Sequence, residues 1–133
     1  MASSKITTIP TINEKTGKRG THQATIWDVP NTPFIINISP GHEDDDKPYY
    51  VVSHKHTGYA VLPCGRMTRK SVTEAAKVFF ENCPEPIKVL LQSEDMEAEE
   101  LQNKIMPIMK DRKNKLSFNN ARNMAFLVLK DAR

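Results

Sequence analysis

The sequence predicts an α+β domain, with a small antiparallel sheet in the N-terminal half and two to three helices in the C-terminal half, packed on one face. Two observations predict it. Short β-branched and aromatic runs fill the first half of the chain, separated by Pro, Gly and acidic residues, whereas from Ser71 onward apolar residues recur with the period of a helix. The repeated strand–helix alternation of a doubly wound fold is absent.

The composition is that of a globular protein. With 133 residues the chain suits one ordinary domain, and its net charge of +3 does not require a nucleic-acid or membrane partner. No stretch approaches the roughly 18–20 consecutive apolar residues of a membrane-spanning helix, and Met1–Pro10 lacks the apolar segment of a secretory signal. We therefore expect a cytoplasmic protein with no membrane partner.

Residues 1–20 are predicted to form a flexible basic tail ahead of a single α+β domain at 21–133. The tail is rich in Ser, Thr, Lys and Gly. Isoleucines at every third position, Ile6, Ile9 and Ile12, are typical of an extended arm that lies along a partner or along its own domain. Three basic residues make the end of the tail positive: Lys15, Lys18 and Arg19.

Four runs in the first half have strand composition: Ala24–Val29, Phe34–Ile38, Tyr49–Ser53 and Tyr59–Pro63. The last two flank a short Gly-containing segment and predict a β-hairpin. An acidic loop, Glu43–Asp46, precedes the hairpin.

The first helix is predicted to begin at a capping box formed by Ser71 and Glu74. Pro84 and Pro86 are expected to end it. Six residues at helical spacing form its predicted inward face: Val72, Ala75, Ala76, Phe79, Phe80 and Cys83.

The segments that follow are predicted from shorter signals. Ile87–Leu91 is expected to be a strand, and Ser93 to start the next helix. Pro107 should kink or break that helix because proline cannot donate to the helical ladder. Ser117 is expected to cap a last helix whose inward face contains Phe118, Ala121, Met124, Ala125, Val128 and Leu129.

Two basic clusters follow the tail. Arg66, Arg69 and Lys70 precede a helix N-terminus, whose free N–H groups attract anions. A second cluster comprises Lys110, Arg112, Lys113 and Lys115. Together with the tail, these clusters predict a phosphate-binding surface on which Tyr49, Tyr50 and Tyr59 could stack on bases. The alternative interpretation is a set of solvated basic turns and a half-buried sheet face.

Histidine and cysteine residues offer the candidates for metal binding or catalysis. His54 and His56 share one face of a strand, and His42 precedes them, but no third ligand is fixed by spacing. We therefore expect no metal and no cofactor. Cys64 lies near basic residues that could lower its pKa, and His54 or His56 of the hairpin could approach it. No nucleophile signature accompanies it.

The leading prediction is a non-enzymatic binding protein that engages a protein partner, either another protein or a second copy of itself. It depends on the separation of charge between the acidic loop and the basic 110–115 cluster, on the basic tail and on exposed tyrosines of the hairpin. The alternative is a nucleic-acid-binding protein that uses the basic tail and this cluster. A third possibility is a small metal- or Cys/His-dependent enzyme.

Overall fold

The computed structural model describes residues 5–12, 19–39, 48–58, 60–93 and 96–132. Within these residues, five strands form one antiparallel sheet in the order of the sequence: β1 (Lys5–Ile12), β2 (Arg19–Asp28), β3 (Phe34–Ile38), β4 (Tyr50–His54) and β5 (Ala60–Gly65). Four helices follow: α1 (Arg69–Asn82), α2 (Glu85–Leu91), α3 (Ala98–Lys110) and α4 (Arg112–Asp131). The predicted α+β class is confirmed, with one helix more than expected.

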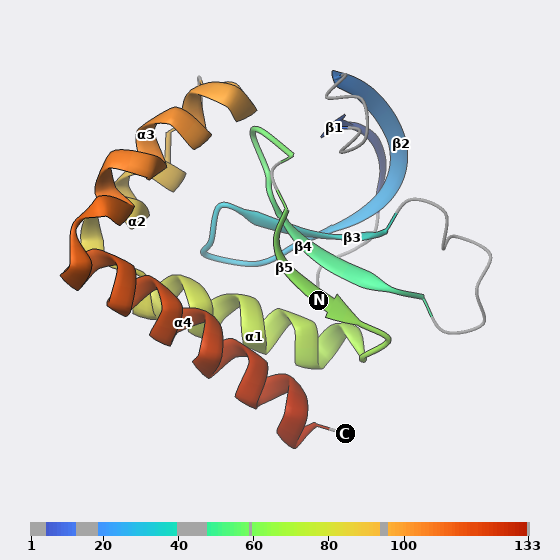
Figure 1. Ribbon diagram of the computed structural model, residues 1–133. Helices are drawn as coiled ribbons and strands as arrows, with labels where there is room; N and C mark the ends of the chain where they lie inside the picture. The colour runs from blue at the N-terminus through green and yellow to red at the C-terminus, as the bar shows by residue number, and fades with distance from the viewer. Residues whose placement is uncertain (1–4, 13–18, 40–47, 59, 94–95, 133) are drawn as a thin grey trace.

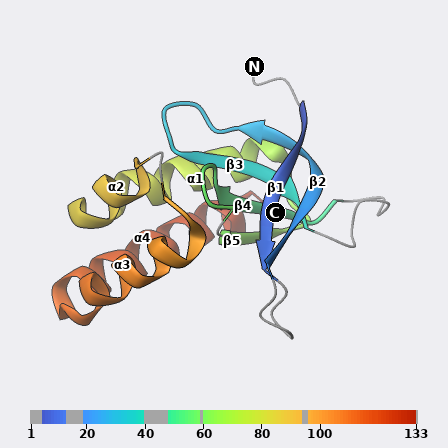
Figure 2. The same ribbon diagram turned by 90° about the horizontal axis from the view of Figure 1, so that it is seen from above.

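The helices lie on one side of the sheet. Helix α1 contacts β3 and β4, and α4 contacts both α1 and β5. Figure 1 shows α1 and α4 side by side and antiparallel, with α2 and α3 extending beyond the sheet. Strand β2 curves strongly, so that β1 and the start of β2 lie on the side of the sheet opposite α1 and α4 (Figures 1 and 2).

The central strands form where their composition predicts them. Strand β3 has the predicted bounds, and the predicted hairpin is β4–β5, in which Val52 is paired with Leu62. Phe34 and Ile36 point into the core beneath the helices, whereas Ile35 packs with Ile26 on the other face. On that other face the Ser53 hydroxyl donates to the Asn37 side-chain carbonyl at 2.7 Å, so both buried polar groups have a partner.

The flexible tail is a wrong prediction for Lys5–Ile12 and for Arg19 and Gly20. Lys5–Ile12 form β1, which pairs with β2 from Lys5 opposite Ile26 to Ile12 opposite Arg19. Thr and Ile make up most of this segment and favour a strand because β-branched side chains fit a pleated surface. The extended arm thus lies along its own sheet. Lys15 and Lys18 lie outside the described residues.

Helix α1 begins earlier than predicted. Its N-cap is Thr68, whose hydroxyl oxygen accepts from the Ser71 backbone N–H at 3.2 Å. Ser71 is inside the first turn, and its hydroxyl is 2.7 Å from that of Thr68. The capping box expected at Ser71 is therefore wrong by one turn.

The strand expected at Ile87–Leu91 is wrong, because these residues belong to α2. Pro84 is the N-cap of α2, and Pro86 lies in its first turn. A proline in the first turn costs no helical hydrogen bond, because the backbone N–H groups of that turn have no acceptor within the helix. Its fixed φ also suits the start of a helix. The two prolines therefore end one helix and start the next, while Ile87 and Leu91 enter the core.

The last two helices also differ from expectation at their ends. The N-cap of α3 is Glu97 rather than Ser93, and α3 continues past Pro107 to Lys110. Helix α4 is capped by Asp111, whose carboxylate accepts from the backbone N–H groups of Lys113 and Asn114 at 2.9 and 3.4 Å. Ser117 lies inside α4, so the predicted cap is wrong by more than one turn.

Candidate interaction surface

The outward face of α4 exposes large apolar side chains. Leu116, Met124 and Leu127 are 54%, 43% and 56% exposed, respectively. Met124 was expected to point inward, and its exposure corrects that prediction. Single exposed leucines are ordinary on protein surfaces. Three large apolar side chains on one face of one helix are less usual and mark a candidate interaction surface.

The inward face of α4 explains why these side chains point outward. Ala121 and Ala125 are fully buried, and Leu129 is nearly so. The Phe118 ring meets Phe79 of α1 edge-on, with the ring centroids 5.6 Å apart. Because the small side chains of α4 face the core, its rotation is fixed by packing and the larger Leu116 and Leu127 remain in solvent.

Polar residues complete a regular row along the outward face, which we call the α4 seam. Successive members are separated by three or four residues, so they lie along one side of the helix. All six side chains are exposed, including the two leucines. The seam consists of Lys113, Leu116, Asn120, Asn123, Leu127 and Lys130.

Positive charge is concentrated where α3 meets α4. Lys110, Arg112, Lys113 and Lys115 are all exposed, as expected for the predicted 110–115 cluster, and we call this group the basic corner. The carboxylate of Asp111 lies among them but caps α4 through its bonds to backbone N–H groups. The N-terminal end of the α4 face is therefore positive.

The other predicted basic residues are not part of this corner. Arg66, Arg69 and Lys70 are exposed at the start of α1, whereas the basic corner lies beside the end of α1 because α1 and α4 are antiparallel (Figure 1). A helix of 14 residues separates the two groups by about 20 Å. The side chains of the tail, including that of Arg19, lie outside the described part of the chain.

Trp27 and Tyr50 form an aromatic pair at the start of α1. The Arg69 guanidinium lies over the Trp27 ring, 4.7 Å from its centroid, and Tyr50 meets Trp27 edge-on at 5.8 Å. Tyr50 is only 9% exposed, so it is not available to stack on a base. Tyr49 is half-buried, and Tyr59 lies outside the described residues. The predicted tyrosine platform is therefore corrected at Tyr50.

The fully buried side chain of His54 links the hairpin to α2 through hydrogen bonds. Its Nε2 bonds the backbone carbonyl of Leu91, and its Nδ1 is 2.9 Å from the Thr57 hydroxyl. Since a carbonyl only accepts, Nε2 carries the proton and Nδ1 accepts from Thr57. Burial lowers the pKa of His54, and the nearby His56 lowers it further, against the opposing effect of the Leu91 carbonyl. The folded protein thus favours the neutral ring.

These bonds leave His54 without a free nitrogen for a metal. Within the described residues, no group of three or more His, Cys, Asp and Glu side chains has the geometry to hold a metal ion. His56 lies in the hairpin turn with its ring edge-on to His54, at 5.7 Å. The remaining histidine of the proposed set, His42, falls outside the described residues.

The thiols are buried. Burial raises the pKa of Cys64 to about 12, and the pKa of Cys83 likewise rises to about 12. The expectation that basic residues lower the pKa of Cys64 is therefore wrong, because burial raises it and the opposing effect comes from a backbone hydrogen bond at Val52 rather than from a basic residue. Cys83 behaves as the small apolar residue predicted for the α1 face.

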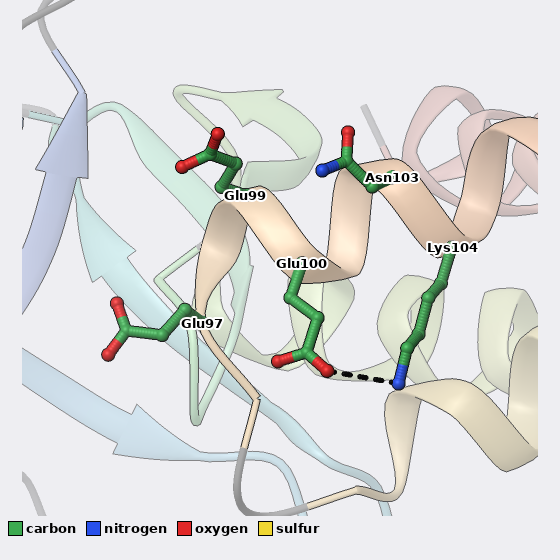
Figure 3. A pocket seen from close by; sticks show the side chains of 5 residues that line it. All are labelled: Glu97, Glu99, Glu100, Asn103 and Lys104. Carbon is green, nitrogen blue, oxygen red and sulfur yellow. Dashed lines mark ion pairs between the residues drawn. The ribbon is translucent and has the colours of Figure 1, made fainter.

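An open depression lies at the start of α3 (Figure 3). It is lined by Glu97, Glu99, Glu100, Asn103 and Lys104. The Glu100 carboxylate pairs with the Lys104 ammonium at 3.0 Å. Carboxylates in the first turn stabilise a helix through its dipole, which accounts for this acidic group. The acidic end of α3 and the basic corner at its other end separate charge along one helix.

Comparisons of the chain with protein-family models, curated proteins and solved structures find no significant match. None of the helices in the described part of the chain has the length and apolar content needed to cross a membrane. The exposed α4 seam was missed from the sequence alone. Its signal was the pair Leu116 and Leu127, two large apolar residues left off the predicted inward face of the last helix.

Proposed function

We propose that this protein is a non-enzymatic binding protein that engages a protein partner through the outward face of α4. The observation that carries the proposal is the alignment of Leu116 and Leu127, each more than half exposed, along one side of a packed helix. Helices with such a stripe recognise partners by burying the stripe in a complementary apolar surface. The basic corner beside Leu116 would orient an approaching partner.

Two features favour binding over catalysis. The Cys64 thiol has its pKa raised to about 12 and is not a nucleophile near neutral pH. Both nitrogens of His54 have partners inside the protein, so this ring has no free site for a substrate proton.

A photo-cross-linking amino acid at position 124 tests the proposal. Met124 is adjacent to the seam and exposed, so the probe reaches a bound partner without entering the core. Cross-linked proteins from the native lysate are identified by mass spectrometry and then titrated, as purified proteins, against the wild-type chain. The proposal requires direct binding that the double variant Leu116→Glu/Leu127→Glu weakens at least about tenfold.

The matched control for this titration is Asn119→Glu. Asn119 is exposed on α4 and is not a member of the seam. Its variant adds one negative charge to the same helix, as does each of the single variants Leu116→Glu and Leu127→Glu, so the control is compared with these single variants as well as with the double variant. Binding that is equally weakened by the control, or no direct binding by any captured protein or by the chain itself, would contradict the proposal.

Nucleic acid is the second candidate partner, favoured by the exposure of all four residues of the basic corner. Contacts between lysine or arginine and phosphate release counterions, so such binding weakens steeply with salt. Fluorescence anisotropy with single- and double-stranded oligonucleotides across a salt series measures this. Charge reversal at Lys110, Arg112 and Lys113 should abolish the binding, whereas reversal at Lys70, at the far end of α1, should reduce it less. Absence of binding at low salt would exclude this candidate.

A further inference from the structure

We infer that the partner of the α4 seam is a second copy of this chain, packed with its α4 antiparallel to the first. The inference rests on the proposed function, because it assigns an occupant to the same surface. Its basis is the order of residues along the seam, which reads Lys, Leu, Asn, Asn, Leu, Lys in either direction. The spacing of three, four, three, four and three residues is also the same in either direction.

A surface that meets its own copy across a two-fold axis must be self-complementary. In the antiparallel pair, Leu116 of each copy lies opposite Leu127 of the other, and both leucines lose their exposure to water. Alternation of three and four residues is the spacing at which two helices pack side by side. The interface therefore contains two contacts between Leu116 of one copy and Leu127 of the other, related by the two-fold axis.

The centre of the seam is polar in a way that suits the same pairing. Asn120 of one copy lies opposite Asn123 of the other, so each side-chain amide faces an amide that can both donate and accept. Asparagine at a buried helix–helix position disfavours pairing with an apolar surface, because the amide would lose its hydrogen bonds. A partner with apolar side chains throughout would leave both amides unsatisfied, whereas a second copy satisfies them.

Charge selects the antiparallel direction. In a parallel pair the two basic corners would lie against each other, with four exposed cations on each side. In the antiparallel pair they are separated by the length of α4, about 30 Å for its 20 residues. Arg112 then lies opposite Asp131 of the second copy, which offsets the facing of Lys113 and Lys130 at the exposed rim.

The occupied surface is small, so we expect a reversible dimer with a dissociation constant in the micromolar range. Sedimentation equilibrium of the full chain, up to several hundred micromolar, measures it. Leu116→Glu should weaken dimerisation about a hundredfold or more, since the two-fold axis places two buried carboxylates in each dimer. Val89→Glu, at a 62% exposed apolar residue on α2, should leave dimerisation unchanged.

Mixtures of variants test the direction of the pair. Leu127→Glu mixed with Leu116→Lys should form a mixed dimer at least about tenfold tighter than either variant alone, because the new charges face each other. Leu116→Glu mixed with Leu116→Lys should not, since in the antiparallel pair each charge faces Leu127. Circular dichroism of each variant confirms that these exposed substitutions leave the fold intact.

The result that would overturn the inference is a wild-type chain that stays monomeric at all concentrations, or a dimer insensitive to Leu116→Glu. A preference for the second mixture over the first would also overturn it, because that result requires parallel helices. A monomeric chain whose cross-linker at position 124 captures a different protein that binds directly would leave the proposed function standing and remove only this inference. A chain that neither dimerises nor binds a captured protein would remove both.

Discussion

The interior between the sheet and the helices differs from the outward face of α4 in how much side-chain surface is removed from water and in whether its polar groups have hydrogen-bond partners. In the interior, large side chains such as Phe34 and Phe79 are 1% and 0% exposed, and even the polar ring of His54 has a partner at each nitrogen. On the outward face, Leu116 and Leu127 keep more than half of their surface in water. Stability therefore depends on the interior, whereas the outward face is available for association.

The largest expected effect is at the centre of the interior. Phe79→Ala removes a ring that packs against Phe34 and Phe118 with centroid distances of 5.8 and 5.6 Å. The free energy of unfolding should fall by about 3–5 kcal/mol, measured by urea denaturation followed by circular dichroism. A loss below about 1 kcal/mol would mean that α1 is not packed on the sheet as described.

A leucine on the buried side of α4 should show a smaller but still large effect. Leu129 is 5% exposed and belongs to the core. Leu129→Ala should lower the free energy of unfolding by about 2–5 kcal/mol in the same urea titration. If the variant is as stable as the wild type, then α4 is rotated or detached relative to α1, and the assignment of its outward face is wrong.

His54 tests whether the interior also depends on a buried polar group, because its ring is fully buried and has a hydrogen-bond partner at each nitrogen. His54→Gln should destabilise the fold by about 1–3 kcal/mol, since the Leu91 carbonyl loses its ring N–H donor. His56→Gln, in the half-buried turn, serves as the control and should change stability less. Equal effects for the two variants would contradict the interior role of His54.

The same residue sets a pH dependence. The folded protein has the pKa of His54 below its ordinary value, so between the two pKa values the unfolded chain binds a proton that the folded chain does not. The contribution of His54 is therefore complete above about pH 6.5 and is lost as the pH falls toward the folded pKa. The pH slope of stability should be flatter in His54→Gln than in the wild type. NMR titration of the wild-type ring checks the direction independently.

The smallest expected effect is on the outward face. Leu127 lies two residues before Leu129 on the same helix, yet is 56% exposed. At concentrations where the chain is monomeric, Leu127→Ala should change the free energy of unfolding by less than about 0.5 kcal/mol. A loss as large as that of Leu129→Ala would show that the two faces of α4 do not differ, and would remove the basis for an interaction surface.

Local signals predicted the parts of the fold that short segments determine. The β-branched run Phe34–Ile38, the hairpin around His54–Gly58 and the apolar face of α1 all formed as expected. Predictions failed where one residue type can either end a helix or start one. A proline ends one helix and can also start the next, so Pro84 and Pro86 did not reveal α2.

Helix caps were predicted from residue type, and neighbouring candidates competed for the same role. Thr68 and Ser71 can each cap a helix, as can Asp111 and Ser117, and in both cases the earlier residue is the cap. The Ile-rich arm became β1 because a free strand edge of β2 was available to pair with it, which local composition alone does not show.

The candidate site was less predictable than the fold. Exposure of the basic corner followed directly from four basic residues within six positions. The α4 seam did not, because the direction in which α4 faces depends on its packing against α1. The sequence-based prediction placed Met124 on the inward face of the last helix, although its side chain is exposed. With Met124 assigned inward, Leu116 and Leu127 were not recognised as a separate row on the outward face.

The Trp27 environment gives the protein an intrinsic optical reporter of folding. The sequence contains one tryptophan, and its indole contacts both Tyr50 of β4 and the Arg69 guanidinium at the start of α1. Its fluorescence therefore reports from a single position, where three elements distant in sequence meet. Because this position is on the sheet and not on α4, emission should follow unfolding and remain unchanged when copies associate. Folding and assembly can thus be recorded as separate signals from one unlabelled sample.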